Sequence, residues 1–169
     1  MSLTSITSAK KFIAPLIGAV VVSTLLTGCG SGKTAATTQI KQVTDGVEGQ
    51  SGLIKIRNLM LVKQADGAGV LIATLVNWSD ESDAITSIKI DGLDAVVTAK
   101  SLDLNKNMPV IFVGDSANAD AAVAQLNEVI GHRVPVIINF AKASPVTLDA
   151  LIVQADGIYA DIANMRFKA

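Results

Sequence analysis

Short stretches in which apolar and polar residues alternate recur from residue 53 to about residue 162, and they constrain the fold more than any other feature. In IKIRN, residues 54–58, the two isoleucines and the asparagine fall on one side, with Lys55 and Arg57 on the other. This period of two is typical of β-strands with one buried face. Together with the apolar run of residues 59–62, further strands are predicted at residues 70–78, 85–92, 95–99, 108–113, 133–140 and 146–153.

About seven or eight short strands, separated by turns every eight to twelve residues, predict an all-β fold of the β-sandwich type. Pro135 lies inside one predicted strand and indicates an edge position or a bulge, because proline cannot donate to a sheet. Residues 118–130 leave two alternatives open. Their alanines favour a helix capped by Asp115 or Ser116 and ended by Gly131, but a short strand followed by a loop fits equally well.

The N-terminus has the layout of an export signal. Lys10 and Lys11 precede an uncharged, mostly apolar segment at residues 12–26, which is shorter than the roughly 20 residues that a membrane-spanning helix needs. Leu26, Thr27, Gly28 and Cys29 follow, and this order resembles a bacterial lipobox. The resemblance implies that the Cys29 thiol receives a diacylglycerol and acyl modification, and that cleavage makes Cys29 the new N-terminus.

The same stretch contains Gly32-Lys33-Thr34, the end of a phosphate-binding loop. The full motif requires a glycine five positions before Gly32, where this chain has Thr27. A long helix should also follow, whereas the next residues are rich in threonine and glycine and are typical of a flexible linker. Nucleotide binding is therefore not expected.

These features divide the chain into four parts: a signal peptide at 1–28, lipidated Cys29 with a linker at 29–52, a sandwich domain at 53–162, and a tail at 163–169. The formal net charge of −1 argues against a nucleic-acid partner. The single cysteine and single histidine exclude a disulfide framework and leave little material for a zinc site or a catalytic triad.

Two stretches of the predicted domain resemble a known family. Asn77, a polar loop and the run from Asp83 to Ile88 are similar to a hairpin of the periplasmic copper chaperones of the PCuAC type, and residues 134–153 resemble that family's closing hairpin. Residues 114–119 and 155–162 are similar to the actinobacterial LpqE-like lipoproteins of this group. The resemblance implies an immunoglobulin-like or cupredoxin-like sandwich over roughly residues 53–162.

The family's copper site does not carry over to this chain. The resemblance implies two His–Met pairs, one after the third strand and one before the closing hairpin, since soft ligands suit Cu(I). Here the corresponding stretches, residues 85–99 and 121–131, contain neither residue type. His132 and Met108 are the remaining candidates, with His132 at a turn and not at a ligand position. No metal site and no cofactor other than the lipid are therefore predicted.

Two aromatic residues, Trp78 and Tyr159, each border polar residues and are candidates for a partner surface. The acidic loop around Asp80 and Glu81 does not match a calcium motif and is interpreted as a solvated hairpin. The sequence thus predicts a monomeric, non-enzymatic lipoprotein at the extracytoplasmic face of the cell membrane. Its domain would bind another envelope component, protein or lipid. The alternative is a copper metallochaperone of the PCuAC type, and an enzyme ranks last.

Overall fold

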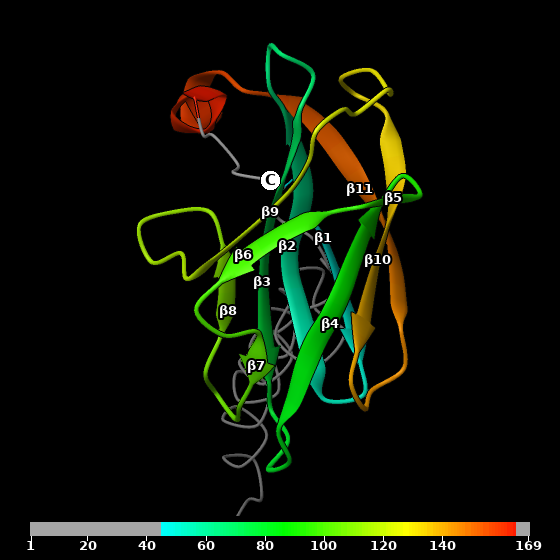
Figure 1. Cartoon of the computed structure of the whole chain (residues 1–169), viewed down its shortest axis with the longest axis vertical. Coiled ribbons are helices and arrows are strands. Elements are labelled where there is room, and N and C mark those ends of the chain that lie inside the picture. The colour runs from blue at the N-terminus through cyan, green and yellow to red at the C-terminus, as the bar shows by residue number, and fades with distance from the viewer. Residues whose placement is uncertain (1–44, 165–169) are drawn as a thin grey trace, which may run out of the picture. The chain divides into compact units, whose positions relative to one another are not determined.

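The computed structural model describes residues 45–164 of the chain. The predicted signal peptide, the lipobox from Leu26 to Cys29, most of the predicted linker and the tail beyond residue 164 lie outside this range. Within it, eleven strands form one continuous sheet that folds over on itself (Figure 1). No helix among these residues is long and apolar enough to span a membrane.

The elements include strands over all seven long segments predicted from the alternation pattern, so the all-β sandwich prediction is confirmed. In chain order they are β1 (Val47–Ser51), β2 (Ile54–Lys63), β3 (Gly69–Asn77), β4 (Asp83–Ile90), β5 (Leu93–Asp94), β6 (Val96–Ala99), β7 (Asp103–Leu104), β8 (Val110–Phe112), β9 (Ala119–Val123), β10 (Arg133–Phe140), β11 (Val146–Gln154) and the 3₁₀ helix η2 (Gly157–Asn164).

The sheet has two layers. One contains β5, β4, β10 and β11, and the other contains β2, β3, β8, β9 and β6, with β1 paired to β2 and the short β7 paired to β4. The layers join where Ile152–Gln154 of β11 runs parallel to Leu61–Lys63 of β2. They approach again where the chain passes from β5 into β6 (Figure 1). This closure removes most free sheet edges.

A β-bulge in β2 explains its irregular apolar spacing. Ile54 and Ile56 are buried and so are Leu59 and Leu61, but the step from Ile56 to Leu59 is three residues, which alternation alone cannot place on one face. The register shifts between Arg57 and Met60, and Asn58 adopts a positive φ of 50° there. The extra residue of the bulge brings Leu59 and Leu61 to the same buried face as Ile54 and Ile56. Asn58 is thus the turning point of the strand, and not a third member of the isoleucine face.

Strand β1 lies within residues 29–52, which the sequence interpretation assigned to the linker. It pairs antiparallel with β2, and two cross-strand contacts, Arg57 to Glu48 and Lys55 to Gln50, line its outer side. Just before it, Gly46 is buried against Asn58, where a Cβ atom would lie 2.6 Å from the Asn58 carbonyl carbon. The folded domain therefore begins before residue 53.

Residues 118–130 form the second of the two alternatives, a strand followed by a loop. Ala119, Ala121 and Val123 of β9 are almost fully buried. Strand β9 pairs with β6 along its length and meets β3 and β8 on its other side. Alanine's helix propensity is weak compared with such pairing, and its small side chain allows β9 to fit between neighbours. The other alternative, a helix capped by Asp115 or Ser116 and ended by Gly131, does not form.

The prediction that Pro135 marks an edge or a bulge is wrong, because β10 is an interior strand between β4 and β11. Its ladder with β4 begins one residue later, at Val136, and its register shift lies at Asn139 and Phe140. The Pro135 carbonyl accepts a hydrogen bond of 2.9 Å from the Asp91 amide. In an antiparallel pair, the backbone nitrogen and oxygen of one residue point toward the same neighbouring strand. The Pro135 nitrogen therefore faces β4, as its carbonyl does, at a position just before the β10–β4 ladder begins. The N–H that proline lacks is not needed there.

The core lies between the two layers and contains aliphatic side chains from both, with Phe112 as the largest fully buried side chain. A second, smaller cluster lies on the outward side of β2 and β3. There Ile162 of η2 covers Val62 and Val70, with Ile72 and Tyr159 packed alongside. The second cluster shows that the C-terminal helix belongs to the folded domain.

Candidate functional site

The two metal-ligand candidates lie far apart. The His132 carbonyl accepts a hydrogen bond of 2.9 Å from the Ile152 amide. Ile152 pairs with Leu61, which in turn pairs with Leu71 of β3. Met108 lies beyond the other end of β3, where the Asn77 carbonyl accepts from the Asn107 amide. The six residue steps from Leu71 to Asn77 span about 20 Å at the usual rise of a strand. One ion cannot bridge His132 and Met108.

His132 itself is exposed, at the turn that leads into β10. Its Nδ1 lies 3.0 Å from Glu128 Oε2, and its amide donates to the Val129 carbonyl over 3.2 Å. Among the described residues, no group of three or more His, Cys, Asp or Glu side chains is arranged to hold a metal ion. The ring therefore makes a local contact that closes a turn.

The two segments in which the PCuAC resemblance implies copper ligands come together in space. Strands β6 and β9 pair antiparallel, with Thr98 opposite Asp120 and Ala99 opposite Ala119. Next to this pair, residues 98–100 and 117–120 line an open pocket of about 450 Å³, named here the β6/β9 pocket. Its polar side chains are a hydroxyl, an ammonium, an amide and a carboxylate. These oxygen and nitrogen groups do not match the soft donors that Cu(I) prefers.

One side chain of the β6/β9 pocket, Asn118, is hydrogen-bonded to the backbone on both sides of its amide group. The Asn118 amide group accepts from the Ile111 backbone N–H over 2.8 Å and donates to the Pro109 carbonyl over 2.9 Å. Asn118 therefore fastens the connection from β8 to β9. Both polar atoms of the Asn118 side chain, which lines the β6/β9 pocket, are therefore hydrogen-bonded to backbone groups.

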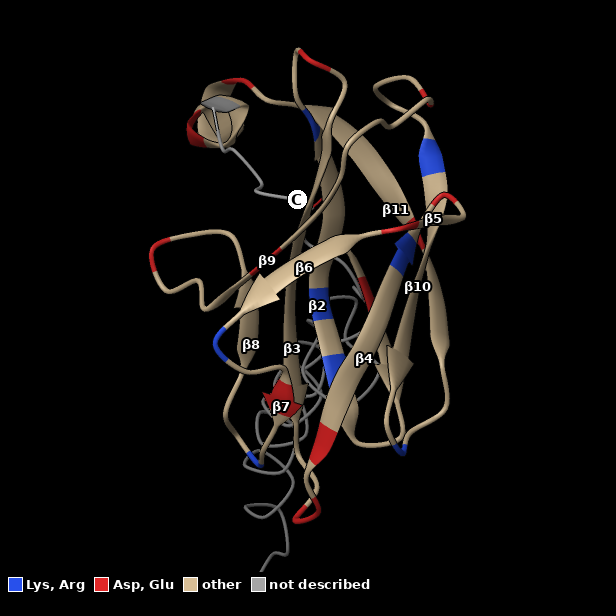
Figure 2. Ribbon diagram, in the orientation of Figure 1, with Lys and Arg blue, Asp and Glu red and all other residues tan. Residues whose placement is uncertain are grey.

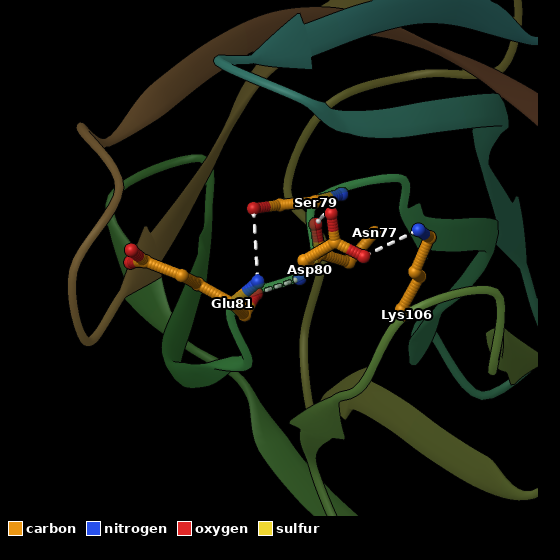
Figure 3. A network of polar contacts seen from close by, with 5 residues as sticks. All are labelled: Asn77, Ser79, Asp80, Glu81 and Lys106. Atoms are coloured by element: carbon orange, nitrogen blue, oxygen red, sulfur yellow. Dashed lines mark hydrogen bonds and ion pairs between the residues drawn. The ribbon is translucent and has the colours of Figure 1, made fainter.

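The polar loop between β3 and β4 is organised by one buried amide (Figure 3). Asn77 is only 1% exposed, and its Nδ2 donates to the carbonyls of Glu81 and Leu104 over 2.7 and 2.8 Å. Its Oδ1 accepts from the Ser79 amide over 2.8 Å. At the rim of the same loop Asp80 pairs with Lys106. The loop that resembles the PCuAC hairpin is thus held by the side chain of Asn77.

Asp83 fastens the closing hairpin to β4. Its carboxylate accepts from the amides of Ala84, Lys142 and Ala143 over 2.8 to 2.9 Å. Burial raises the pKa of Asp83, but these backbone donors together hold the pKa below its ordinary value. A pocket of about 240 Å³ lies beside the Asp83 carboxylate, between residues 51–54 and 142–143. Most of its polar side chains bond to nearby backbone, as Ser51 does to the Ser144 carbonyl. Sequence patterns did not assign roles to Asn77 and Asp83, although both stand in the stretch that carries the resemblance.

The two aromatic candidates have different environments. Trp78 is 52% exposed, and Lys55 Nζ lies 5.5 Å above its ring. Tyr159 is half-buried in the cluster under η2, and burial together with the nearby Asp45 carboxylate raises the pKa of its hydroxyl. The Trp78 ring is therefore exposed on the surface of the domain, whereas the Tyr159 ring packs against the second apolar cluster. Charged residues of both signs are interspersed over the strands and loops in Figure 2.

Comparison with known proteins gives a fold but no sequence family. No family model matches this chain, and no curated protein matches it. Among solved structures, the chain is similar to the copper-bound PCuAC domain from PmoF2, at 19% identity and a TM-score of 0.54, covering 64% of this chain and 98% of that one. The apo PCuAC domain from PmoF1 aligns at 23% identity and a TM-score of 0.55, covering 64% and 99%.

The apo PmoF2 PCuAC domain aligns at 18% identity and a TM-score of 0.56, covering 66% of this chain and 98% of that one. Identities of this size show the fold alone. Since nearly all of each PCuAC domain aligns with part of this chain, the folded domain has the PCuAC-type, cupredoxin-like fold.

Proposed function

We propose that this chain is a non-enzymatic binding protein of the cell envelope, whose PCuAC-type domain is held at the extracytoplasmic face of the membrane by a lipid on Cys29. The observation that carries the proposal is the pairing of β6 with β9 in a PCuAC-type fold, because the facing residues contain no histidine, cysteine or methionine. The order of Lys10, the apolar segment and Cys29 supports the anchor. Kinship with the actinobacterial LpqE-like lipoproteins is part of this proposal.

The bound component is another envelope molecule, protein or lipid, and the domain acts as a monomer. The exposed Trp78 supports this role, since large aromatic side chains at a surface are typical of contact sites. The interspersed charges support the absence of a nucleic-acid partner.

Copper transfer is the second candidate, and one specific observation favours it. The similar solved structures are PCuAC domains, one of them copper-bound, and none of these comparisons speaks for an envelope partner. A copper site at β6 and β9 in this chain would use the groups of the β6/β9 pocket, which include the Thr98 hydroxyl and the Asp120 carboxylate. Cu(I) binds such oxygen donors weakly.

Competition for Cu(I) separates the two functions. The full chain carrying Cys29→Ser, which removes the only thiol, is titrated with Cu(I) in the presence of a strong chelator. We expect the chelator to retain the metal, and the same result for His132→Ala and Met108→Ala variants. If the protein withdraws one equivalent and a substitution at His132 or Asp120 abolishes this, the chain is a copper chaperone and the first proposal fails.

A further inference from the structure

The β6/β9 pocket contains polar side chains whose hydrogen-bonding capacity the fold does not use. Thr98, Lys100 and Asp120 line it, beside the backbone-bonded Asn118. Within residues 45–164, the Thr98 hydroxyl, the Lys100 ammonium and the Asp120 carboxylate have no hydrogen-bond or ion-pair partner. These three groups are therefore available to a ligand.

The register of the sheet places the three groups on one face. Thr98 pairs directly with Asp120, and the side chains of directly paired residues lie on the same side of a sheet. Lys100 follows Thr98 by two residues, just past the end of β6, and is a diagonal neighbour of Asp120. Diagonal neighbours are about 7–8 Å apart, within reach of a long side chain. An ammonium and a carboxylate thus line one pocket without forming an ion pair with each other.

The segment that forms the other wall of the pocket, residues 117–120, follows a strained turn. Val113 has a φ of 70° and Gly114 a φ of 108°, although β-branched residues rarely adopt a positive φ. After the turn, the Ala117 amide donates to the Gly114 carbonyl over 2.9 Å, and the Asn118 amide donates to the Ile111 carbonyl over 3.0 Å. Strain that surrounding contacts hold in place is typical of preformed binding sites. This wall is therefore fixed before a ligand binds.

The charges of the pocket favour a ligand that carries both signs. Lys100 and Asp120 cancel, so a simple anion or a simple cation would leave one of them without an opposite charge. The Lys100 ammonium and the Thr98 hydroxyl donate toward anionic oxygens, whereas the Asp120 carboxylate accepts from an N–H. The diagonal spacing suits charges several bonds apart, as in a phosphate and a primary ammonium joined by a short carbon chain. A volume of about 450 Å³ admits such a group.

We propose that the β6/β9 pocket binds a phosphoethanolamine group, with the phosphate on Lys100 and Thr98 and the primary ammonium on Asp120. The inference rests on the proposed function, because it names the chemical class of the envelope component. The group exists as a free solute and as the headgroup of phosphatidylethanolamine. Phosphocholine is the discriminating analogue, since its quaternary ammonium has no N–H to donate to Asp120.

Binding is measured on the full chain carrying Cys29→Ser, titrated with O-phosphoethanolamine while backbone amide signals are followed by NMR. We expect saturable shifts at residues 98–100 and 117–120, which line the pocket. Inorganic phosphate, ethanolamine and phosphocholine should each bind at least about tenfold more weakly, because each lacks one of the charged contacts.

Two variants test the named contacts. Asp120→Asn and Lys100→Gln should each lower the affinity for O-phosphoethanolamine by about tenfold, as expected for the loss of one charge-assisted hydrogen bond. Asp115→Asn is the matched control, because Asp115 is an exposed carboxylate of the preceding turn that does not line the pocket. It should bind as the natural side chain does. Unchanged urea midpoints verify that the variants fold.

Vesicles distinguish the two sources of the group. The protein is sedimented with phosphatidylethanolamine vesicles and, separately, with phosphatidylcholine vesicles. Stronger binding to the former that Asp120→Asn removes identifies the lipid headgroup as the ligand. Binding of O-phosphoethanolamine without this difference between vesicles identifies the free solute.

The absence of shifts at residues 98–100 and 117–120 overturns the inference. Shifts that persist unchanged in both Asp120→Asn and Lys100→Gln also overturn it. Competition for Cu(I) on the same preparation separates this result from the proposed function. Copper withdrawn from the chelator overturns the proposed function, whereas copper left on the chelator together with no ligand shifts overturns the pocket ligand alone.

Discussion

Two polar residues of the β3–β4 region, Asn77 and Asp83, hold the backbone at this end of the domain. Each satisfies three backbone groups that would otherwise be unpaired at the end of the sandwich. Unpaired buried groups cost more than a formed bond contributes, which explains why loops of this kind depend on single amide or carboxylate side chains. In the part of the sequence that resembles the PCuAC hairpin, these two side chains thus hold the backbone of the fold in place.

Asp83→Asn should destabilise the domain by about 1–3 kcal/mol at neutral pH, because it replaces a charged acceptor of three amides with a neutral one. The folded-state pKa of Asp83 lies below its ordinary value, so its contribution is full above pH 4 and is lost as the pH falls further. Urea unfolding at pH 7 and pH 3 measures this. The difference in unfolding free energy between the natural chain and the variant should be smaller at pH 3 than at pH 7. A difference that does not change with pH would contradict a stabilising role of the ionised Asp83 carboxylate.

At the scale of elements, η2 completes the outward face of the sheet. Strand β3 is apolar on both faces, so its outward side chains Val70 and Ile72 need cover. Ile162 and Tyr159 provide it, and Gln64 Nε2 donates to the Ile162 carbonyl, which fixes the end of the helix. The C-terminal helix therefore covers a second, smaller apolar core on the outward face of β2 and β3.

Ile162→Ala should lower the free energy of unfolding by about 2 kcal/mol, since it removes buried carbon atoms and leaves a cavity. The matched variant Ile158→Ala on the same helix should change it by less than about 0.5 kcal/mol, because that side chain is 87% exposed. Chemical denaturation of the two variants decides the matter. Equal effects would show that η2 does not pack as described.

The strands with strong alternation could be predicted from the sequence, whereas β1 was assigned to the linker and β9 was left open between a helix and a short strand. Strand β1 has only one apolar residue among VEGQS, and its pairing depends on cross-strand contacts such as Arg57 with Glu48. For β9 the alanines left a helix and a short strand equally open, and pairing with neighbouring strands decides for the strand over the helix propensity of alanine. The bulge at Asn58 is visible in the spacing of Ile56 and Leu59, although only the structure shows how it is absorbed.

At the scale of the whole molecule, the sequence predicted the domain's fold but not its surface. The separation of His132 from Met108, the pairing of β6 with β9 and the joining of Leu53 with Trp78 depend on contacts distant in sequence. The candidate role of Trp78 followed from its polar neighbours, whereas its position over Lys55 required the register of β2 and β3. Cys29 lies outside the described residues, and its lipidation stays a prediction.

We propose that the PCuAC-type fold serves here as a lipid-anchored domain without resident copper. Native mass spectrometry of the protein extracted from membranes tests it most directly, because one spectrum reports the N-terminus, the lipid and any bound metal. We predict a chain of 141 residues beginning at Cys29 (169 minus 28), carrying a diacylglycerol and acyl modification and no copper. A chain that begins at Met1 without lipid, or one that retains one copper per molecule, would contradict the account.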